Sequence, residues 1–408
     1  MIMKILQVNC VYGKGSTGKI VEGIHRGLLE RGIASVVCYG RGCRVDKPNI
    51  YKVCGEIYSK LNNALSRLTG LMYGGCFFST NRLIRRIKQE KPDVVHLHCI
   101  NGYFVNIYRL IAFLKGSGIP TVLTLHAEFM HTANCGHALD CEKWKTGCGK
   151  CPRRKKETKS LFIDGTARSW RKMKAAFEGF DNLEVVSVSP WLMERAKQSP
   201  ILADKKHSVV YNGVDTRIFK PYDTADLRKT LGIEENEKVV FHATPNFNLD
   251  PDGLKGGYYI AKLAEQMPDV RFIVAGPYDP SCVYPPNMLL LGHISDQTYL
   301  ARLYSMADVT VIASKRETFS MICAESLCCG TPVAGFKAGA PEMISLPEHS
   351  AFVEYGDLFG LEDLVRNALK KAKETDQVRE ESLVAYSKKQ MVNRYIDVYI
   401  KLMDKMKI

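Results

Sequence analysis

Short, uniformly apolar segments alternate with helical patterns along the chain, and this alternation limits the possible fold more than any other feature. In the first half, apolar segments occur at residues 4–10, 35–39, 94–98, 121–126 and 183–188. The intervening patterns predict helices at 17–31, 81–89, 104–115 and 165–177. Strands that are apolar on both faces are typical of parallel sheets covered by helices. The sequence therefore predicts a doubly wound α/β domain.

The same alternation restarts after Asn212-Gly-Val-Asp215. Strands are expected at 239–243, 271–275, 289–291, 309–313 and 332–336, with helices at 257–267, 297–306, 319–329 and 361–373. Because 408 residues suffice for two cores, we predict Rossmann-like domains at 1–210 and 211–380, with an interdomain cleft. Residues 381–408 are expected to form a helix that crosses back to the first domain. Its expected apolar face carries Met391, Tyr395, Val398 and Leu402.

The chain is basic, with 57 Lys and Arg against 43 Asp and Glu and a formal net charge of +14. This charge favours anionic partners such as nucleotide diphosphates, an acidic membrane surface or nucleic acid. Nucleic acid is disfavoured because basic and aromatic residues do not interleave as in such modules. Residues 1–10 resemble a strand rather than a signal peptide, and no apolar run reaches about 20 residues. We expect a cytoplasmic protein, with peripheral contact to the inner membrane face as a hypothesis.

Two glutamates, Glu317 and Glu325, flank the start of the helix expected from residue 319 to residue 329. At ~1.5 Å rise per residue they would lie on the order of 12 Å apart, roughly the span from ribose to sugar in a nucleotide sugar. The backbone amides of Phe319, Ser320 and Met321 would form an anion site between them. The alternative is an ordinary pair of exposed helix glutamates.

Gly13-Lys-Gly-Ser-Thr17-Gly18-Lys-Ile20 follows the first strand and resembles a phosphate-binding loop. Ile20 stands where a Ser or Thr hydroxyl would hold magnesium, which argues against an NTPase. A glycine-rich turn that lets the backbone approach a ligand fits better, with Thr17 and Gly18 at the cleft.

His126 ends a strand, at the edge where open parallel sheets bind ligands. His96, on the neighbouring strand, is interpreted as structural. Lys255 lies before a helix of the second domain, where an ammonium group could neutralise a departing diphosphate. The alternatives are a satisfied core or rim histidine and a surface-loop lysine.

Four cysteines gather in Cys135-x5-Cys141-x6-Cys148-x2-Cys151. The final CxxC pair has the spacing of a zinc knuckle, and disulfides are disfavoured in the cytoplasm. Structural zinc is the favoured interpretation and reduced thiols are the alternative. Four thiolates would leave no open position, so such a metal would not be catalytic.

These motifs resemble the retaining, nucleotide-sugar-dependent glycosyltransferases of family four, which have the GT-B fold. The resemblance rests on Gly15-Ser-Thr-Gly18, Thr124-Leu-His126, Asn212-Gly-Val-Asp215, Lys255-Gly256 and the two glutamates followed by Gly330-Thr-Pro-Val333. The cysteine segment is similar to a subgroup of bacterial exopolysaccharide, capsule and colanic-acid-type transferases.

The resemblance implies that Glu317 contacts the donor sugar and that Glu325 holds the ribose hydroxyls. Lys255 and the amides of residues 319–321 would hold the diphosphate, while His126, Thr17 and Gly18 would line the sugar side. This sequence departs from the family pattern at two places. An arginine usually found shortly before the lysine is missing, and Ala127-Glu128-Phe129 replaces the usual Asp and aromatic residue.

We therefore expect a hexosyl- or deoxyhexosyltransferase that moves a sugar to a lipid-linked or oligosaccharide acceptor. It would need no obligatory catalytic metal, because Lys255 and the helix terminus supply the positive charge. The alternatives are a non-catalytic sugar-nucleotide or nucleic-acid binder and a sugar-nucleotide epimerase. The sequence does not choose the donor base, the sugar, the acceptor or the linkage.

Overall fold

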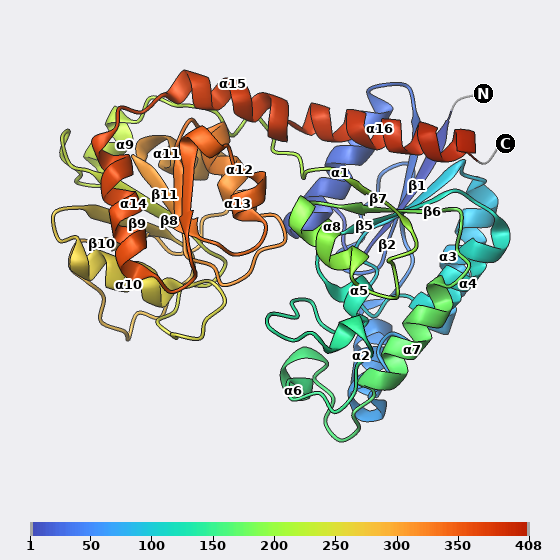
Figure 1. Ribbon diagram of the computed structural model, residues 1–408. Helices are drawn as coiled ribbons and strands as arrows, with labels where there is room; N and C mark the ends of the chain where they lie inside the picture. Colours follow the sequence, from blue (N-terminus) through green and yellow to red (C-terminus); the bar gives the residue numbers. More distant parts are fainter. Residues whose placement is uncertain (1–2, 406–408) are drawn as a thin grey trace. The chain divides into compact units, whose positions relative to one another are not determined.

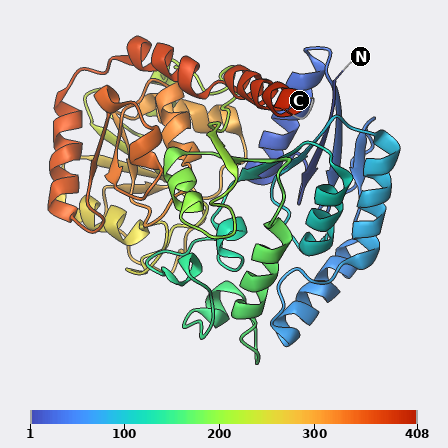
Figure 2. The same cartoon turned by 45° about the vertical axis from the view of Figure 1, so that its right-hand side comes forward.

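The computed structural model describes residues 3–405, which divide into two compact units. The first unit comprises Met1–Tyr211 together with Met391–Ile408, and the second comprises Asn212–Gln390. The chain therefore passes from one unit to the other twice (Figures 1 and 2).

The first unit is built on a sheet of seven parallel strands among the described residues, in the order β3-β2-β1-β4-β5-β6-β7. The strands are β1 (Lys4–Asn9), β2 (Ala34–Tyr39), β3 (Ile50–Lys52), β4 (Val94–Leu97), β5 (Thr121–Leu125), β6 (Leu183–Ser187) and β7 (Lys206–Val209). Central strands β4, β5 and β6 are buried along their full length. This burial explains their lack of polar alternation.

Helices cover this sheet. They are α1 (Gly15–Leu29), α2 (Glu56–Thr69), α3 (Phe77–Glu90), α4 (Ile107–Ser117), α5 (Phe129–Thr132), α6 (Arg154–Glu157), α7 (Thr166–Phe177) and α8 (Pro190–Lys197), with a 3₁₀ turn η1 at Lys143–Lys145. The final helix α16 (Lys388–Lys405) also packs here, because its residues from Met391 on share a core with α1. The expected apolar face of Met391, Tyr395, Val398 and Leu402 is buried in that core.

The expectation of a single helix at residues 381–408 was wrong; residues 406–408 lie outside the described part. The helix is interrupted between α15 (Thr375–Tyr386) and α16. Ser387 is extended, with φ −63° and ψ 144°. Val214 N donates to Tyr386 O at 2.7 Å, and Lys388 N donates to Val214 O at 3.1 Å. These bonds to a distant segment replace the helical ones.

The second unit contains six parallel strands within its described residues, in the order β10-β9-β8-β11-β12-β13. They are β8 (Val239–Ala243), β9 (Arg271–Ala275), β10 (Met288–Leu290), β11 (Val309–Ile312), β12 (Val333–Phe336) and β13 (Ser350–Val353). The helices are α9 (Ala225–Thr230), α10 (Gly257–Gln266), α11 (Gln297–Met306), α12 (Met321–Cys328), α13 (Pro341–Ile344), α14 (Leu358–Lys370) and α15, with a 3₁₀ turn η2 at Pro347–His349. The prediction of two doubly wound, parallel-sheet domains is confirmed.

Candidate active site

In the second unit, two loops at the carboxyl ends of neighbouring strands bring Lys255 and Glu317 together. Lys255 follows β8 and precedes α10, whereas Glu317 follows β11. Lys255 Nζ lies 2.6 Å from Glu317 Oε1. The side chains are 33% and 14% exposed, respectively, so the pair is reachable from solvent but largely shielded.

Backbone contacts between the same loops hold this arrangement in place. Lys315 N donates to Leu254 O at 2.9 Å. Gly256 has φ +67°, and a Cβ at this position would lie 1.9 Å from Ala313 O. Only glycine permits both this backbone conformation and this close approach. The Lys255-Gly256 pair is therefore a structural unit, in which the glycine lets the lysine loop lie against the end of β11.

Helix α12 begins at Met321, two residues later than predicted, and Ser320 is its N-cap. Ser320 has φ +75°, and its hydroxyl accepts a hydrogen bond from Cys323 N at 3.3 Å. Phe319 and Ser320 therefore precede the helix instead of forming its first turn. The predicted helix start is thus corrected by two residues, and the anion site expected at the amides of residues 319–321 stays a prediction.

Glu325 projects from the second turn of α12. Its Oε2 lies 3.3 Å from the hydroxyl group of Tyr304, a fully buried residue of α11. Burial, together with the nearby charge of Glu325, raises the pKa of Tyr304 well above its usual value. Tyr304 is therefore a hydrogen-bond donor to the carboxylate at any ordinary pH, and it fixes one Glu325 oxygen.

In the first unit, three histidines line the ends of β4 and β5. His98 Nδ1 lies 3.2 Å from His126 Nε2, and the rings of His96 and His98 lie 3.9 Å apart. Burial lowers the pKa of His126 to about 4 and that of His98 well below its usual value. Both rings are therefore neutral near pH 7, so that one of the two facing nitrogens donates and the other accepts.

His96 is held within the core. Its two ring nitrogens lie 2.7 Å from the hydroxyl groups of Tyr399 and Thr124. These contacts tie β4 to α16 and β5. They agree with its interpretation as a structural residue.

Thr17 and Gly18 lie in the first turn of α1, because this helix begins at Gly15. The helix was expected to start at residue 17, so its true start is two residues earlier, and the assignment of Thr17 and Gly18 to the sugar side stays a prediction. Gly13 N donates to Gly18 O at 3.1 Å, so the glycine-rich segment folds back onto the helix start. A Cβ on Gly18 would lie 3.3 Å from Gly13 N and 3.1 Å from the side chain of Val11. Gly18 thus permits the tight packing of this loop.

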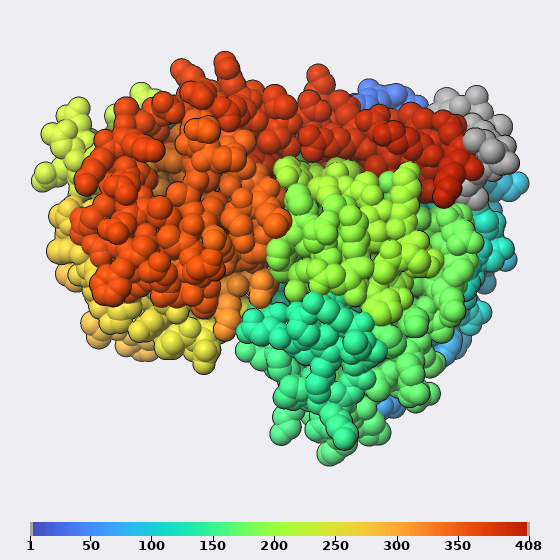
Figure 3. All heavy atoms as spheres, in the orientation of Figure 1, coloured from blue at the N-terminus to red at the C-terminus, as the bar shows by residue number. Residues whose placement is uncertain are grey.

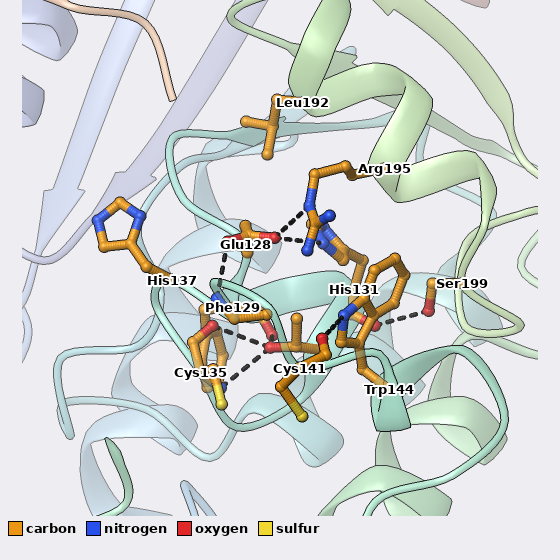
Figure 4. Close-up of polar contacts among 12 residues, drawn as sticks. Glu128, Phe129, His131, Cys135, His137, Cys141, Trp144, Leu192, Arg195 and Ser199 are labelled. Atoms are coloured by element: carbon orange, nitrogen blue, oxygen red, sulfur yellow. Dashed lines mark hydrogen bonds and ion pairs between the residues drawn. The ribbon is translucent and has the colours of Figure 1, made fainter. Parts of the chain in front are cut away.

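Directly after His126, the fully buried Glu128 organises the cysteine-containing segment (Figure 4). Its carboxylate lies 2.5 Å from Arg195 Nε and accepts from Ala138 N at 2.7 Å. Burial raises the pKa of Glu128, but His131, Arg195 and the Ala138 amide outweigh this effect and lower it to about 2. The Arg195 guanidinium also lies over the ring of Trp144, 4.9 Å from its centroid.

All four predicted zinc ligands, Cys135, Cys141, Cys148 and Cys151, are free thiols of intermediate exposure. Within residues 3–405, no group of three or more His, Cys, Asp or Glu side chains is arranged to hold a metal ion. The zinc expectation is not confirmed, and elemental analysis of the purified protein would test it.

The sequence predictions missed three contacts between distant residues. These are the Glu128–Arg195 ion pair, the His98–His126 contact and the Tyr304–Glu325 hydrogen bond. One of the three had a signal in the sequence. Ala127-Glu128-Phe129 stands where the family usually has Asp and an aromatic residue, and a carboxylate beside a buried strand requires a cationic partner.

Two doubly wound, parallel-sheet domains in one chain are the architecture of the GT-B glycosyltransferases. Residues 18–218 match the model for Glycosyltransferase Family 4. Residues 259–371 match Glycosyl transferases group 1. The chain belongs to the glycosyltransferases that combine these two domains, and it is an enzyme of this class.

One curated relative and two solved structures match over nearly their whole length. The chain is 24% identical over 420 residues to the putative colanic acid biosynthesis glycosyl transferase WcaC of Escherichia coli (strain K12), covering 97% of this chain and 99% of the relative. Sucrose-phosphate synthase from Thermosynechococcus elongatus matches with a TM-score of 0.67 and 15% identity, covering 99% and 100% of the two chains. Anabaena Alr3699/HepE, solved in complex with UDP-glucose, matches with a TM-score of 0.62 and 14% identity, covering 98% and 100%.

No helix in the described part of the chain is long and apolar enough to cross a membrane.

Proposed function

We propose that this protein transfers a sugar, with retention of anomeric configuration, from a nucleotide-diphosphate sugar to a glycan or glycolipid acceptor in surface polysaccharide synthesis. The contact between Lys255 and Glu317 carries the proposal. It places a cation beside a carboxylate at the strand ends of the second unit, where open α/β sheets bind ligands. The solved complex of Anabaena Alr3699/HepE with UDP-glucose supports this class of donor.

The charges suggest how such a transfer would proceed. The anomeric carbon–oxygen bond to the diphosphate breaks while an acceptor hydroxyl oxygen bonds to the same carbon. The Lys255 ammonium would stabilise the charge that develops on the diphosphate. A donor phosphate oxygen would take the acceptor proton, so this step requires no protein base.

Glu317 is assigned to binding the sugar rather than to attacking it. A carboxylate 2.6 Å from an ammonium group is stabilised as an anion and is a weaker nucleophile. Its charge can instead accept hydrogen bonds from sugar hydroxyls and favour positive charge at the anomeric carbon. Glu325 would hold the ribose, and His126, Thr17 and Gly18 would line the sugar side. The Lys255 charge removes the need for a catalytic metal.

The first experiment is a thermal-shift panel of nucleotide sugars, followed by transfer assays with the donor that stabilises the protein. Glu317→Gln and Lys255→Ala are each expected to lower transfer by about 10² or more, as when groups that stabilise the transition state are removed. Turnover at the parent rate in both variants would reject the site assignment.

Lys262 and Glu265 provide a matched control. They form an exposed ion pair of 2.7 Å on α10, within the same unit. Lys262→Ala and Glu265→Gln are expected to leave transfer unchanged. Salt-sensitive binding of oligonucleotides without any use of a sugar donor would instead favour the binding-protein alternative.

A further inference from the structure

Helix α2 has its apolar side chains on the outside. Ile57, Leu61, Leu65 and Leu68 are 48 to 77% exposed. At about 100° per residue, these four positions fall within an arc of roughly 80° on one face of the helix. A surface helix in a water-soluble domain normally shows the opposite orientation.

The buried face of α2 is polar. Ser59 and Ser66 are its only buried residues, and they lie on the side opposite the leucines. Ser59 Oγ donates to Gly102 O at 3.3 Å, and Ser66 Oγ lies 3.4 Å from the hydroxyl group of Tyr103. The helix is therefore anchored by hydrogen bonds, and its apolar face is available for another contact.

Neighbouring segments extend the exposed apolar face at both ends of α2. Phe78 of α3 is 79% exposed, and its backbone N donates to the Tyr58 hydroxyl group at 3.3 Å. At the other end, Leu161 N donates to Arg67 O at 2.9 Å. Leu161, Phe162 and Ile163 are each more than half exposed. We call the set Ile57, Leu61, Leu65, Leu68, Phe78, Leu161, Phe162 and Ile163 the α2 face.

Basic side chains border this face. Residues 150–174 contain ten Lys and Arg against two Asp and Glu. Arg153, Arg154, Lys155 and Lys156 line a surface hollow of about 460 Å³. Arg154 donates to Phe162 O at 2.9 Å, so this basic segment directly adjoins the α2 face. In Figure 3 the segment that follows residue 150 is coloured green and lies at the surface of the first unit.

Charge selects among the possible occupants of this face. In a symmetric dimer the same surface meets itself, which would bring two basic clusters together. An anionic bilayer instead accepts apolar side chains into its interface and attracts lysine and arginine near its surface. We propose that the α2 face docks the protein on the anionic surface of a lipid bilayer.

Vesicle flotation tests this proposal. The purified full chain is expected to float with vesicles of phosphatidylcholine and phosphatidylglycerol, and much less with phosphatidylcholine alone. Leu61→Ser combined with Leu65→Ser, and Phe162→Ser separately, should each lower the bound fraction about tenfold, because binding scales with buried apolar area. Lys155→Glu with Lys156→Glu should also weaken binding to the anionic vesicles.

Phe359→Ser is the matched control. Phe359 is 76% exposed on α14 of the second unit, against 74% for Phe162. It is expected to float like the parent. Because all substituted side chains are exposed, unfolding midpoints should stay at the parent value, and this measurement excludes misfolding as the cause of lost binding.

Three results would overturn the proposal: no flotation of the parent with anionic vesicles, equal flotation of the α2-face variants, or a dimeric parent that these variants make monomeric. The third result would assign the face to a second copy. The same samples should keep their thermal shift with a sugar donor. Absence of that shift in every sample would count against the proposed transferase function, and the membrane result would stand independently.

Discussion

Lys255 Nζ and Glu317 Oε1 lie 2.6 Å apart, so each charge neutralises the other when no ligand is bound. A diphosphate that binds to Lys255 therefore competes with Glu317 for the same ammonium group. This competition predicts that the two residues affect nucleotide binding in opposite directions.

We expect Lys255→Ala to weaken binding of the nucleoside diphosphate about tenfold, because one charge-assisted contact is lost. Glu317→Gln should bind the same nucleotide at least as tightly as the parent, while transfer falls. Isothermal titration calorimetry measures both affinities. Equal losses of affinity in the two variants would show that the pair acts only as a structural clamp.

Glu325 is predicted to recognise ribose hydroxyls. The parent should bind a 2′,3′-dideoxynucleoside diphosphate about tenfold more weakly than the ribonucleotide, since hydrogen bonds to a carboxylate are lost. Glu325→Ala should reduce this difference to nearly nothing. Tyr304→Phe, which removes the group that fixes Glu325 Oε2, should reduce it in part. If Glu325→Ala still prefers the ribonucleotide to the dideoxynucleotide as strongly as the parent does, the ribose does not bind at Glu325.

Ser320 combines a helix cap with a positive φ of 75°. Ser320→Ala is expected to lower the free energy of unfolding by about 1 kcal/mol, because the cap is lost and the backbone strain remains. Ser320→Gly should cost less, because glycine tolerates positive φ. Urea unfolding of the parent and both variants measures their order of stability. If glycine is the more destabilising substitution, backbone strain is not what distinguishes this position.

Glu128 should make stability depend on pH in the acid range. Its pKa is about 2 when folded, below the ordinary value of 4.5, so the unfolded chain binds its proton more readily. Its stabilising contribution is complete above about pH 4.5 and is lost as the pH falls through about 2. Glu128→Gln should lower the free energy of unfolding by about 3 kcal/mol at pH 7, since it removes the buried charge 2.5 Å from the Arg195 guanidinium and leaves that largely shielded group only the more distant Glu142 carboxylate, at 3.9 Å.

Chemical unfolding of both proteins at several pH values checks this prediction. The parent and Glu128→Gln should approach one another in stability as the solution becomes acidic. Glu194→Gln, at an exposed surface position, should match the parent at every pH. A constant difference between parent and Glu128→Gln would mean that this carboxylate is not the titrating group.

Much of the fold could be predicted because strands such as β5 and β11 are buried on both faces and therefore apolar throughout. Motif residues at strand ends, such as Lys255 and His126, could be placed for the same reason. The contacts that these residues make with distant parts of the sequence could not be predicted. The residues of the Lys255–Glu317 pair are 62 positions apart and those of the Glu128–Arg195 pair are 67 apart, and no periodicity connects them.

Helix α2 and the break at Ser387 were both missed. The apolar residues of α2 recur at helical spacing, and only the structure shows that they face outward. Ser387 has neither glycine nor proline beside it. Its helix ends because Val214, more than 170 residues earlier, takes the backbone hydrogen bonds of Tyr386 and Lys388.

The return of α16 to the first core makes the second unit an insertion within the first. A fragment ending at Tyr211 would lose Met391, Tyr395 and Leu402 and would expose the side chains of Ile20 and Ile24 that they cover. Residues 212–390 form a continuous segment, whereas the first unit requires two separate pieces of chain. Exchange of the second unit between relatives would therefore need two junctions, one on each side of this segment.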